Sequence, residues 1–177
     1  DVSSVTDMGG MFSSAYKFNQ DLSGWNVSNV TDMNQTFSNA NDFNSPLNNW
    51  DVSKVTSMHN IFSGTGQFNQ PLNNWDVSSV TDMSGVFQGS KFNQDISGWD
   101  VSSVTNMGSM FAYAHNFNQS LNDWDVSNVR QMNAMFIDNY FFNQPLDGWD
   151  VSSVTQMNAM FANASEFDQD ISGWDVS

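Results

Sequence analysis

Apolar residues recur along the chain at an interval close to 25 residues. The steps between successive tryptophans are 25, 25, 24, 25, 25 and 25 residues, and columns of Val, Met, Phe and Leu or Ile keep the same rhythm. A unit of this size cannot bury a core by itself. The pattern therefore predicts a solenoid, in which each apolar column packs against its copies in the neighbouring units.

The repeats form one continuous array, which we predict to be a single domain. The seven units end at tryptophans and a partial unit follows: 1–25, 26–50, 51–75, 76–99, 100–124, 125–149, 150–174 and 175–177. Unit 76–99 has lost one residue between two phenylalanines, so we expect a surface loop there. Neither end has a polar capping unit. We therefore expect a fragment of a longer array, or repeats that associate end to end.

Within each unit, the spacing of the apolar residues predicts a short helix and a short strand. Val80, Met83 and Phe87 stand at i, i+3 and i+7, on one face of a helix. Gly85 weakens this helix and favours a short or partly 3₁₀ segment. Trp99 and Val101 alternate with polar residues, as in a strand. The predicted fold class is an α/β solenoid with parallel strands.

The charge balance narrows the classes of partner. The chain has 19 acidic and 4 basic residues, a net charge of −15, and no cysteine. Nucleic acid and anionic membrane surfaces are therefore not expected as partners, because both require a basic footprint. No apolar run reaches the roughly 18 residues of a membrane span, so direct membrane insertion of this segment is not expected. Such a charge attracts cations or basic partners.

Two recurring phrases carry a resemblance to known repeats. "SVTDM" followed by "MF", and "FNQ" followed by "WDVSSVT", resemble the bacterial surface-protein repeat of mycoplasma-type lipoproteins and the BspA-like leucine-rich repeats. The resemblance covers all seven units. It implies a right-handed, leucine-rich-repeat-like coil that is extracellular or at the cell surface of a bacterium, secreted or anchored, with a role in adhesion or recognition. It implies no particular ligand.

Two columns are candidates for structural ladders or for binding surfaces. The tryptophans could stack sugar rings, but an exposed row would form a large apolar patch, so we expect them to close the core. The asparagines could bind a ligand or satisfy backbone groups in successive coils, and we expect the second role. The two columns are Trp25, Trp50, Trp75, Trp99, Trp124, Trp149 and Trp174, and Asn19, Asn44, Asn69, Asn93, Asn118 and Asn143.

An aspartate column follows the tryptophans and has three interpretations. Each carboxylate could accept backbone N–H bonds in an Asx-turn, calcium could bridge the coils, or the column could be an acidic stripe that faces a partner. We expect the turns, and hence no cofactor, with calcium as the weaker alternative. The column includes Asp51, Asp76, Asp100, Asp125 and Asp150. A threonine column, interrupted by Arg130, leaves ice binding as a further alternative.

Nothing in the repeat predicts an enzyme. His59 and His115 occupy different columns without a partner at catalytic or metal-ligating spacing, and no Ser-His-Asp order repeats. The most variable segment lies between "MF" and "FNQ". We expect it to contact an unknown host or cell-surface protein or glycan through Tyr16, Tyr113, His115 and Tyr140. The alternative is a structural spacer that only projects another domain.

Overall fold

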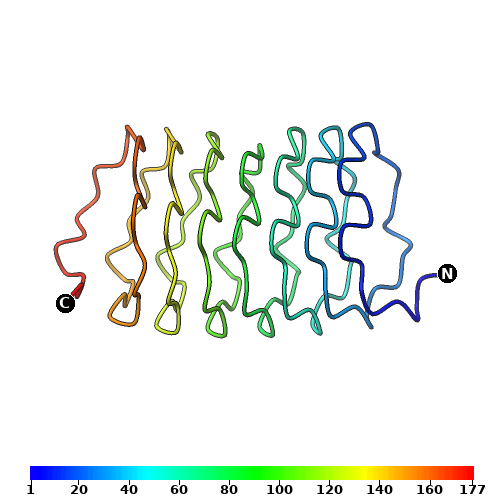
Figure 1. Cartoon of the computed structure of the whole chain (residues 1–177), viewed down its shortest axis with the longest axis horizontal. Coiled ribbons are helices and arrows are strands. Elements are labelled where there is room, and N and C mark those ends of the chain that lie inside the picture. Colours follow the sequence, from blue (N-terminus) through cyan, green and yellow to red (C-terminus); the bar gives the residue numbers. More distant parts are fainter.

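The computed structural model describes residues 1–177 and shows a row of stacked coils (Figure 1). The two chain ends lie at opposite ends of the row, and each coil is one repeat. One isolated parallel bridge joins each pair of neighbouring coils at equivalent positions: Asp7 with Asp32, Asp32 with Ser57, Ser57 with Asp82, Asp82 with Asn106, Asn106 with Gln131, and Gln131 with Gln156.

The predicted α/β solenoid, with a helix and a strand in each leucine-rich-repeat-like unit, is wrong. The structure has no helix, and its strand pairing is limited to the isolated bridges. Turns and extended segments make up the rest of every coil. The columns of the repeat are nevertheless in register, because the backbone hydrogen bonds between coils join residues 23 to 26 positions apart, such as Thr31 N–H to the Thr6 carbonyl.

The segment expected to be helical forms a ribbon of consecutive turns. Every second backbone N–H group donates to the next coil. Those of Met83, Gly85, Phe87 and Gly89 donate to carbonyls of that coil at 2.8–2.9 Å. Between them, the N–H groups of Val86 and Gln88 return to the carbonyls three residues earlier, at 3.4 and 3.1 Å, and that of Ser84 donates to Asp82 Oδ1 at 2.9 Å. A helix would direct each of these N–H groups to the carbonyl four residues earlier within the same coil. The alternation therefore replaces the helix.

Backbone torsions enforce this ribbon. The turn from Met83 to Val86 has Gly85 at its third position with φ of 62°, which is the requirement of a type II turn. Gly89 has φ of 64° four residues later. Every coil carries the same pair of left-handed residues, and ten of them are not glycine: Ser14, Gln35, Asn39, Asn60, Ser109, Tyr113, Ala134, Asp138, Ala159 and Asn163. A left-handed residue every four positions excludes a right-handed helix.

The predicted strand is also replaced by turns, although its alternation of buried and exposed residues is present. Trp99 and Val101 are buried whereas Asp100 is exposed. The N–H of Ser102 donates to Asp100 Oδ1 at 3.0 Å, and the N–H of Val104 returns to the Val101 carbonyl at 2.9 Å. These N–H groups are consequently not available for a strand ladder between coils.

Two stacked columns of phenylalanine form the centre of the core. Within a coil the two rings lie 3.9–4.2 Å apart, as between Phe87 and Phe92 at 4.0 Å. Between coils, centroids in the same column are separated by 5.4–6.4 Å. Each interior ring therefore contacts one partner in its own coil and one in each neighbouring coil. The Val, Met and Leu columns surround these rings in one continuous cluster.

The tryptophans close the core on another side. The five interior indoles are 2–4% exposed. From the second coil onward, each Nε1–H donates to the carbonyl of the Leu or Ile that precedes the tryptophan of the previous coil, as from Trp75 to Leu47 at 2.9 Å. Trp25 has no preceding coil and is half-buried. The column therefore offers no exposed row of rings for sugar stacking.

One buried polar side chain has no hydrogen-bond partner. Asn139 is fully buried, and neither its amide nitrogen nor its amide oxygen forms a hydrogen bond. Other coils have Ala, Ser or Thr at this position, and Thr65 Oγ1 donates to the Phe62 carbonyl at 2.6 Å. An unpartnered buried amide costs free energy that a smaller or hydrogen-bonded side chain does not.

We expect Asn139→Thr to raise the free energy of unfolding by about 1–2 kcal/mol, because threonine can donate to the Phe136 carbonyl as Thr65 does to Phe62. Equilibrium denaturation in urea measures the change. Asn139→Ala is the matched variant, and it should stabilise by less because it adds no hydrogen bond. Destabilisation by both variants would contradict this account.

Candidate functional site

The asparagine column links each coil to the next. The side-chain oxygen of each asparagine accepts the backbone N–H of the following member at 2.9–3.0 Å, as from Asn69 N–H to Asn44 Oδ1. The adjacent glutamine column often donates to the same oxygen, as from Gln119 to Asn93 at 2.9 Å. These oxygens consequently satisfy backbone groups within the protein and are not free to recognise a ligand.

The aspartate column forms Asx-turns at the surface. Oδ1 of Asp51 accepts both the N–H and the hydroxyl of Ser53, at 3.2 and 2.7 Å. The hydrogen bonds from serine lower the pKa values of Asp51, Asp100 and Asp150, because they stabilise the charged carboxylate. Asn26 keeps the same backbone contact with Ser28 at 3.1 Å. A local turn thus explains the constant position of the column in the repeat.

These lowered pKa values predict a dependence of stability on pH. The contribution is fully present above the ordinary aspartate pKa of 3.8 and is lost as the pH falls through the lower pKa of the folded state. We expect the turns to add a decrease in melting temperature only below about pH 4. The triple variant Asp51→Asn, Asp100→Asn, Asp150→Asn should show a smaller decrease, because Asn26 already keeps the turn. An equally steep decrease in the variant would show that these turns are not responsible.

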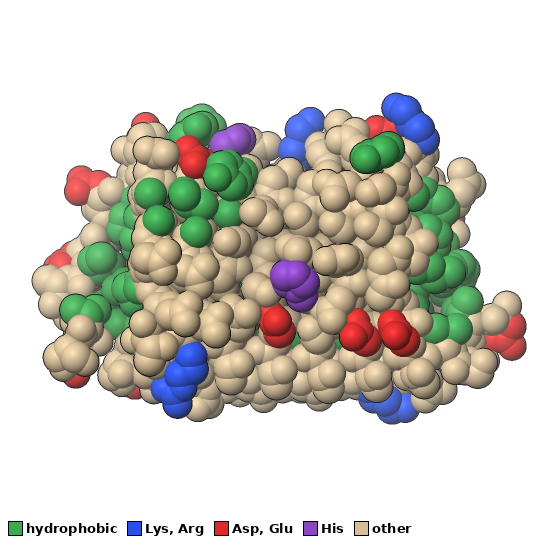
Figure 2. All heavy atoms as spheres, in the orientation of Figure 1, with side chains coloured by type: hydrophobic (Ala, Val, Ile, Leu, Met, Phe, Trp, Pro, Cys, Tyr) green, Lys and Arg blue, Asp and Glu red, His purple; other side chains and the backbone are tan.

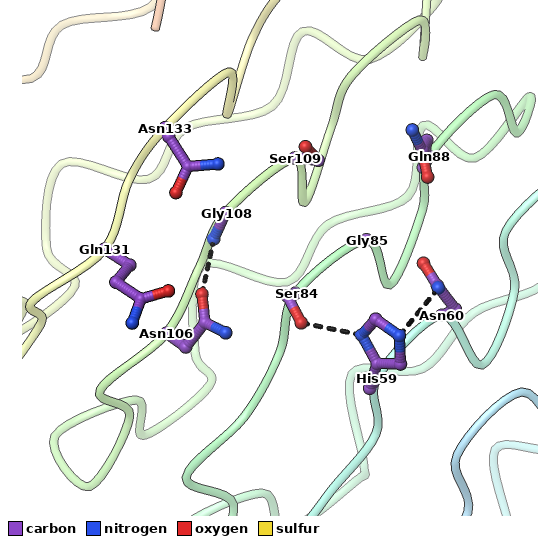
Figure 3. Close-up of a pocket in the computed structure, with 10 residues that line it drawn as sticks. All are labelled: His59, Asn60, Ser84, Gly85, Gln88, Asn106, Gly108, Ser109, Gln131 and Asn133. Carbon is purple, nitrogen blue, oxygen red and sulfur yellow. Dashed lines mark hydrogen bonds between the residues drawn. The ribbon is translucent and has the colours of Figure 1, made fainter. Parts of the chain in front are cut away.

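A polar groove crosses four coils on the face formed by the turn ribbons (Figure 3). Its volume is about 220 Å³, and no hydrophobic residue lines it. His59 lies at one end, with Nδ1 2.7 Å from Ser84 Oγ and Nε2 2.9 Å from the Asn60 amide nitrogen. Asn106 and Gly108 form a further hydrogen bond in its wall at 3.0 Å.

The order of hydrogen bonds in this groove differs from that of a nucleophilic triad. Ser84 Oγ donates to Asp82 Oδ1 at 2.6 Å and so accepts from His59 Nδ1–H. Nε2 accepts from the Asn60 amide. In a triad the imidazole accepts the serine proton and the carboxylate contacts the imidazole. Here the carboxylate contacts the serine, so His59 serves to join neighbouring coils.

A second recess lies at the edge formed by the variable loops. The loop Gln88–Lys91 has four residues where the other coils have five. The stack of Phe87 on Phe92 stays at 4.0 Å, so the missing residue is taken from the surface. The resulting recess, which we call the notch, has a volume of about 220 Å³ and is lined by Gly66, Gly89, Ser90, Lys91, Tyr113, His115 and Asn116.

Aromatic side chains lie beside the notch. The rings of His115 and Tyr140 stack at 4.6 Å with an angle of 2° between their planes, and His115 Nδ1–H donates to the Asp138 carbonyl at 2.6 Å. Tyr113, Tyr140 and Phe141 are 46%, 42% and 58% exposed. Figure 2 shows hydrophobic side chains gathered beside a histidine along the upper edge. We call Tyr113, His115, Tyr140 and Phe141 the aromatic edge.

The structure brings together three of the four residues predicted to contact a partner. Tyr113 and His115 line the notch, and Tyr140 stacks on His115. Tyr16 occupies the same column as His115 but in the first coil, with three coils between them. Phe141 was missed by sequence reasoning, although it replaces Lys, Asp, Gln, Asn or Glu of the other coils at its position.

Two further features of the site are negative. No three or more His, Cys, Asp or Glu side chains converge in a way that could hold a metal ion. The structure also contains no helix with the length and hydrophobicity needed to cross a membrane.

Comparison with known proteins places the chain in a family. No curated protein and no solved structure matches it. The family model described as "Mycoplasma protein of unknown function, DUF285" matches residues 1–99 and 81–177, which together span the whole chain. This match confirms the resemblance to mycoplasma-type repeats and does not extend to leucine-rich repeats. The chain therefore belongs to the DUF285 family of repeat proteins.

Proposed function

We propose that the chain is a non-enzymatic recognition module of a bacterial cell surface, anchored or secreted, which binds another macromolecule through the aromatic edge. The observation that supports this most directly is the exposure of Tyr113, Tyr140 and Phe141 on one edge. The repeat buries nearly all of its other large apolar side chains. Exposed aromatic residues gathered in one place are typical of sites that contact a partner.

The way the edge is built also supports recognition. The turn ribbons, the phenylalanine stacks and the asparagine column repeat from coil to coil and fix the backbone beneath the loops. The loops vary in sequence on this constant support. Binding residues are commonly carried by loops that a rigid scaffold positions. The constant columns therefore serve as scaffold, and the edge is the part that can differ between repeats.

The double variant Tyr140→Ser, Phe141→Ser tests this proposal against the spacer alternative. Binding of the purified chain to immobilised extracellular-matrix proteins and glycans is measured by surface plasmon resonance. We expect the parent to bind at least one surface and the variant to bind it at least about tenfold more weakly, because a buried aromatic contact contributes 2 kcal/mol or more. A spacer would be indifferent to both substitutions.

The matched control is Val176→Ser, which replaces an exposed apolar side chain away from the edge. It should leave binding unchanged. Thermal melting of all three proteins establishes that they are equally folded, which is expected because Tyr140 and Phe141 are exposed. Equal binding by the parent and the double variant would exclude the aromatic edge as the recognition surface.

A further inference from the structure

The notch concentrates hydrogen-bond donors that have no partner within the protein. At three of the six junctions between coils a loop N–H donates to the preceding coil, as from Gln67 to the Asn41 carbonyl at 3.1 Å. This bond is absent at both junctions of coil 76–99, which has the four-residue loop, and at the junction between coils 100–124 and 125–149. The backbone N–H groups of Lys91 and Asn116 and the carbonyl of Gly66 consequently form no hydrogen bond. At the notch the four-residue loop thus coincides with backbone groups that have no partner within the protein.

A cation without a partner stands at the same place. Lys17 pairs with Asp42 at 2.9 Å, Lys54 donates to Asn29 at 2.8 Å, and Arg130 donates to the Ser153 carbonyl at 2.9 Å. Lys91 forms neither an ion pair nor a hydrogen bond and lines the notch. Lys91 is therefore the one cation of the four whose charged group contacts no other group of the protein. Its ammonium is free to pair with an external anion.

The other side chains that line the notch are aromatic and polar. Tyr113 is the single hydrophobic residue that lines the notch, and His115 lies beside it. An apolar side chain of a peptide would find little surface to contact there. A sugar ring presents C–H groups that pack on an aromatic face and hydroxyls that hydrogen-bond to groups such as Ser90 and Asn116.

We infer that the notch binds a sugar that carries a carboxylate, such as a uronic acid. Lys91 Nζ pairs with the carboxylate, the free N–H groups of Lys91 and Asn116 donate to ring or carboxylate oxygens, and Tyr113 packs against the ring. This inference rests on the proposed function and names the class of macromolecule, an acidic glycan, that the aromatic edge would contact.

Titration calorimetry with the whole chain tests this inference. The probe is a short oligosaccharide of alternating glucuronic acid and N-acetylglucosamine, and the neutral control is an oligomer of N-acetylglucosamine. We expect the neutral control to bind at least about tenfold more weakly, because it lacks the charge-assisted hydrogen bond of the carboxylate. Lys91→Gln should lose a similar factor. Lys17→Gln, which removes a cation that is already paired with Asp42, should change nothing.

A glycine inserted between Ser90 and Lys91 provides a second variant. It restores the five-residue loop of the other coils, so the chain should remain folded while the notch is filled and binding is lost. Equal affinity for the acidic and neutral probes, or an unchanged affinity in Lys91→Gln, would overturn the inference. So would binding of an acidic peptide in place of the sugar.

Both proposals can fail separately. Where the acidic sugar does not bind but Tyr140→Ser, Phe141→Ser still weakens binding to an immobilised partner, the aromatic edge recognises something else and the notch inference is wrong. Where the sugar binds through Lys91 but no macromolecular surface is bound through the edge, the proposed recognition of a macromolecule is wrong.

Discussion

Phe87→Ala should lower the free energy of unfolding by about 3–5 kcal/mol, the range observed when a buried aromatic side chain is truncated. Phe87 is fully buried in the central coil, and its ring lies 4.0 Å from Phe92. It also lies 5.9 Å from Phe62 and 5.8 Å from Phe111, in the two neighbouring coils. Removal of its ring therefore weakens the interfaces of the central coil with both of its neighbours.

The position of Phe87 adds a second expectation. In a stack where each coil contacts only its neighbours, stability is close to a sum of coil and interface terms. Weakening both interfaces at the centre should allow the two halves to unfold at different urea concentrations, so the transition becomes broader. Circular dichroism and tryptophan fluorescence, measured through the same titration, detect this.

Phe141→Ala is the matched control, because this ring is 58% exposed and should change stability by less than about 0.5 kcal/mol. A loss in Phe87→Ala no larger than that of the control would refute the central role of the phenylalanine stack.

The columns of the core could be read from the sequence, but the backbone that carries them could not. Val80, Met83 and Phe87 do face the core, and their spacing is equally compatible with a helix. What excludes the helix is the alternation of N–H groups between the next coil and the preceding turn, which is a property of the stacked state. Asn39, Gly64 and Gly89 did signal a left-handed position, since Asn and Gly favour it. Tyr113 occupies the same column, and a tyrosine does not indicate a left-handed backbone, so the column as a whole did not predict one.

The candidate site was predictable in part for a similar reason. The variable loops and their tyrosines stand out once the repeats are compared, and so does the missing residue before Phe92. The sequence does not reveal that Lys91 has no partner, because that depends on which loops lie next to it and where their acidic residues point. Asp42 is the acceptor for Lys17, and nothing equivalent stands beside Lys91.

The second large effect is expected from the indole hydrogen bonds. In Trp75→Phe the ring is replaced by a smaller one, and the Leu47 carbonyl loses the Nε1–H that donates to it at 2.9 Å. Trp75 is 4% exposed, so little water can reach that carbonyl in its place. An unpaired buried acceptor costs about 1–3 kcal/mol, and the smaller ring adds a cavity term. We expect a loss of about 2–4 kcal/mol in urea denaturation.

Trp25→Phe separates the hydrogen bond from the change in ring size. Trp25 lies in the first coil, is half-buried, and has no carbonyl of a preceding coil to which it could donate. The same substitution there removes a similar volume but leaves no acceptor unpaired, so its loss should be less than half of that in Trp75→Phe. Equal losses at the two positions would assign the effect to packing alone. A larger loss at Trp75 would support a contribution of the indole hydrogen bond across the coils, added to the fuller burial of that ring.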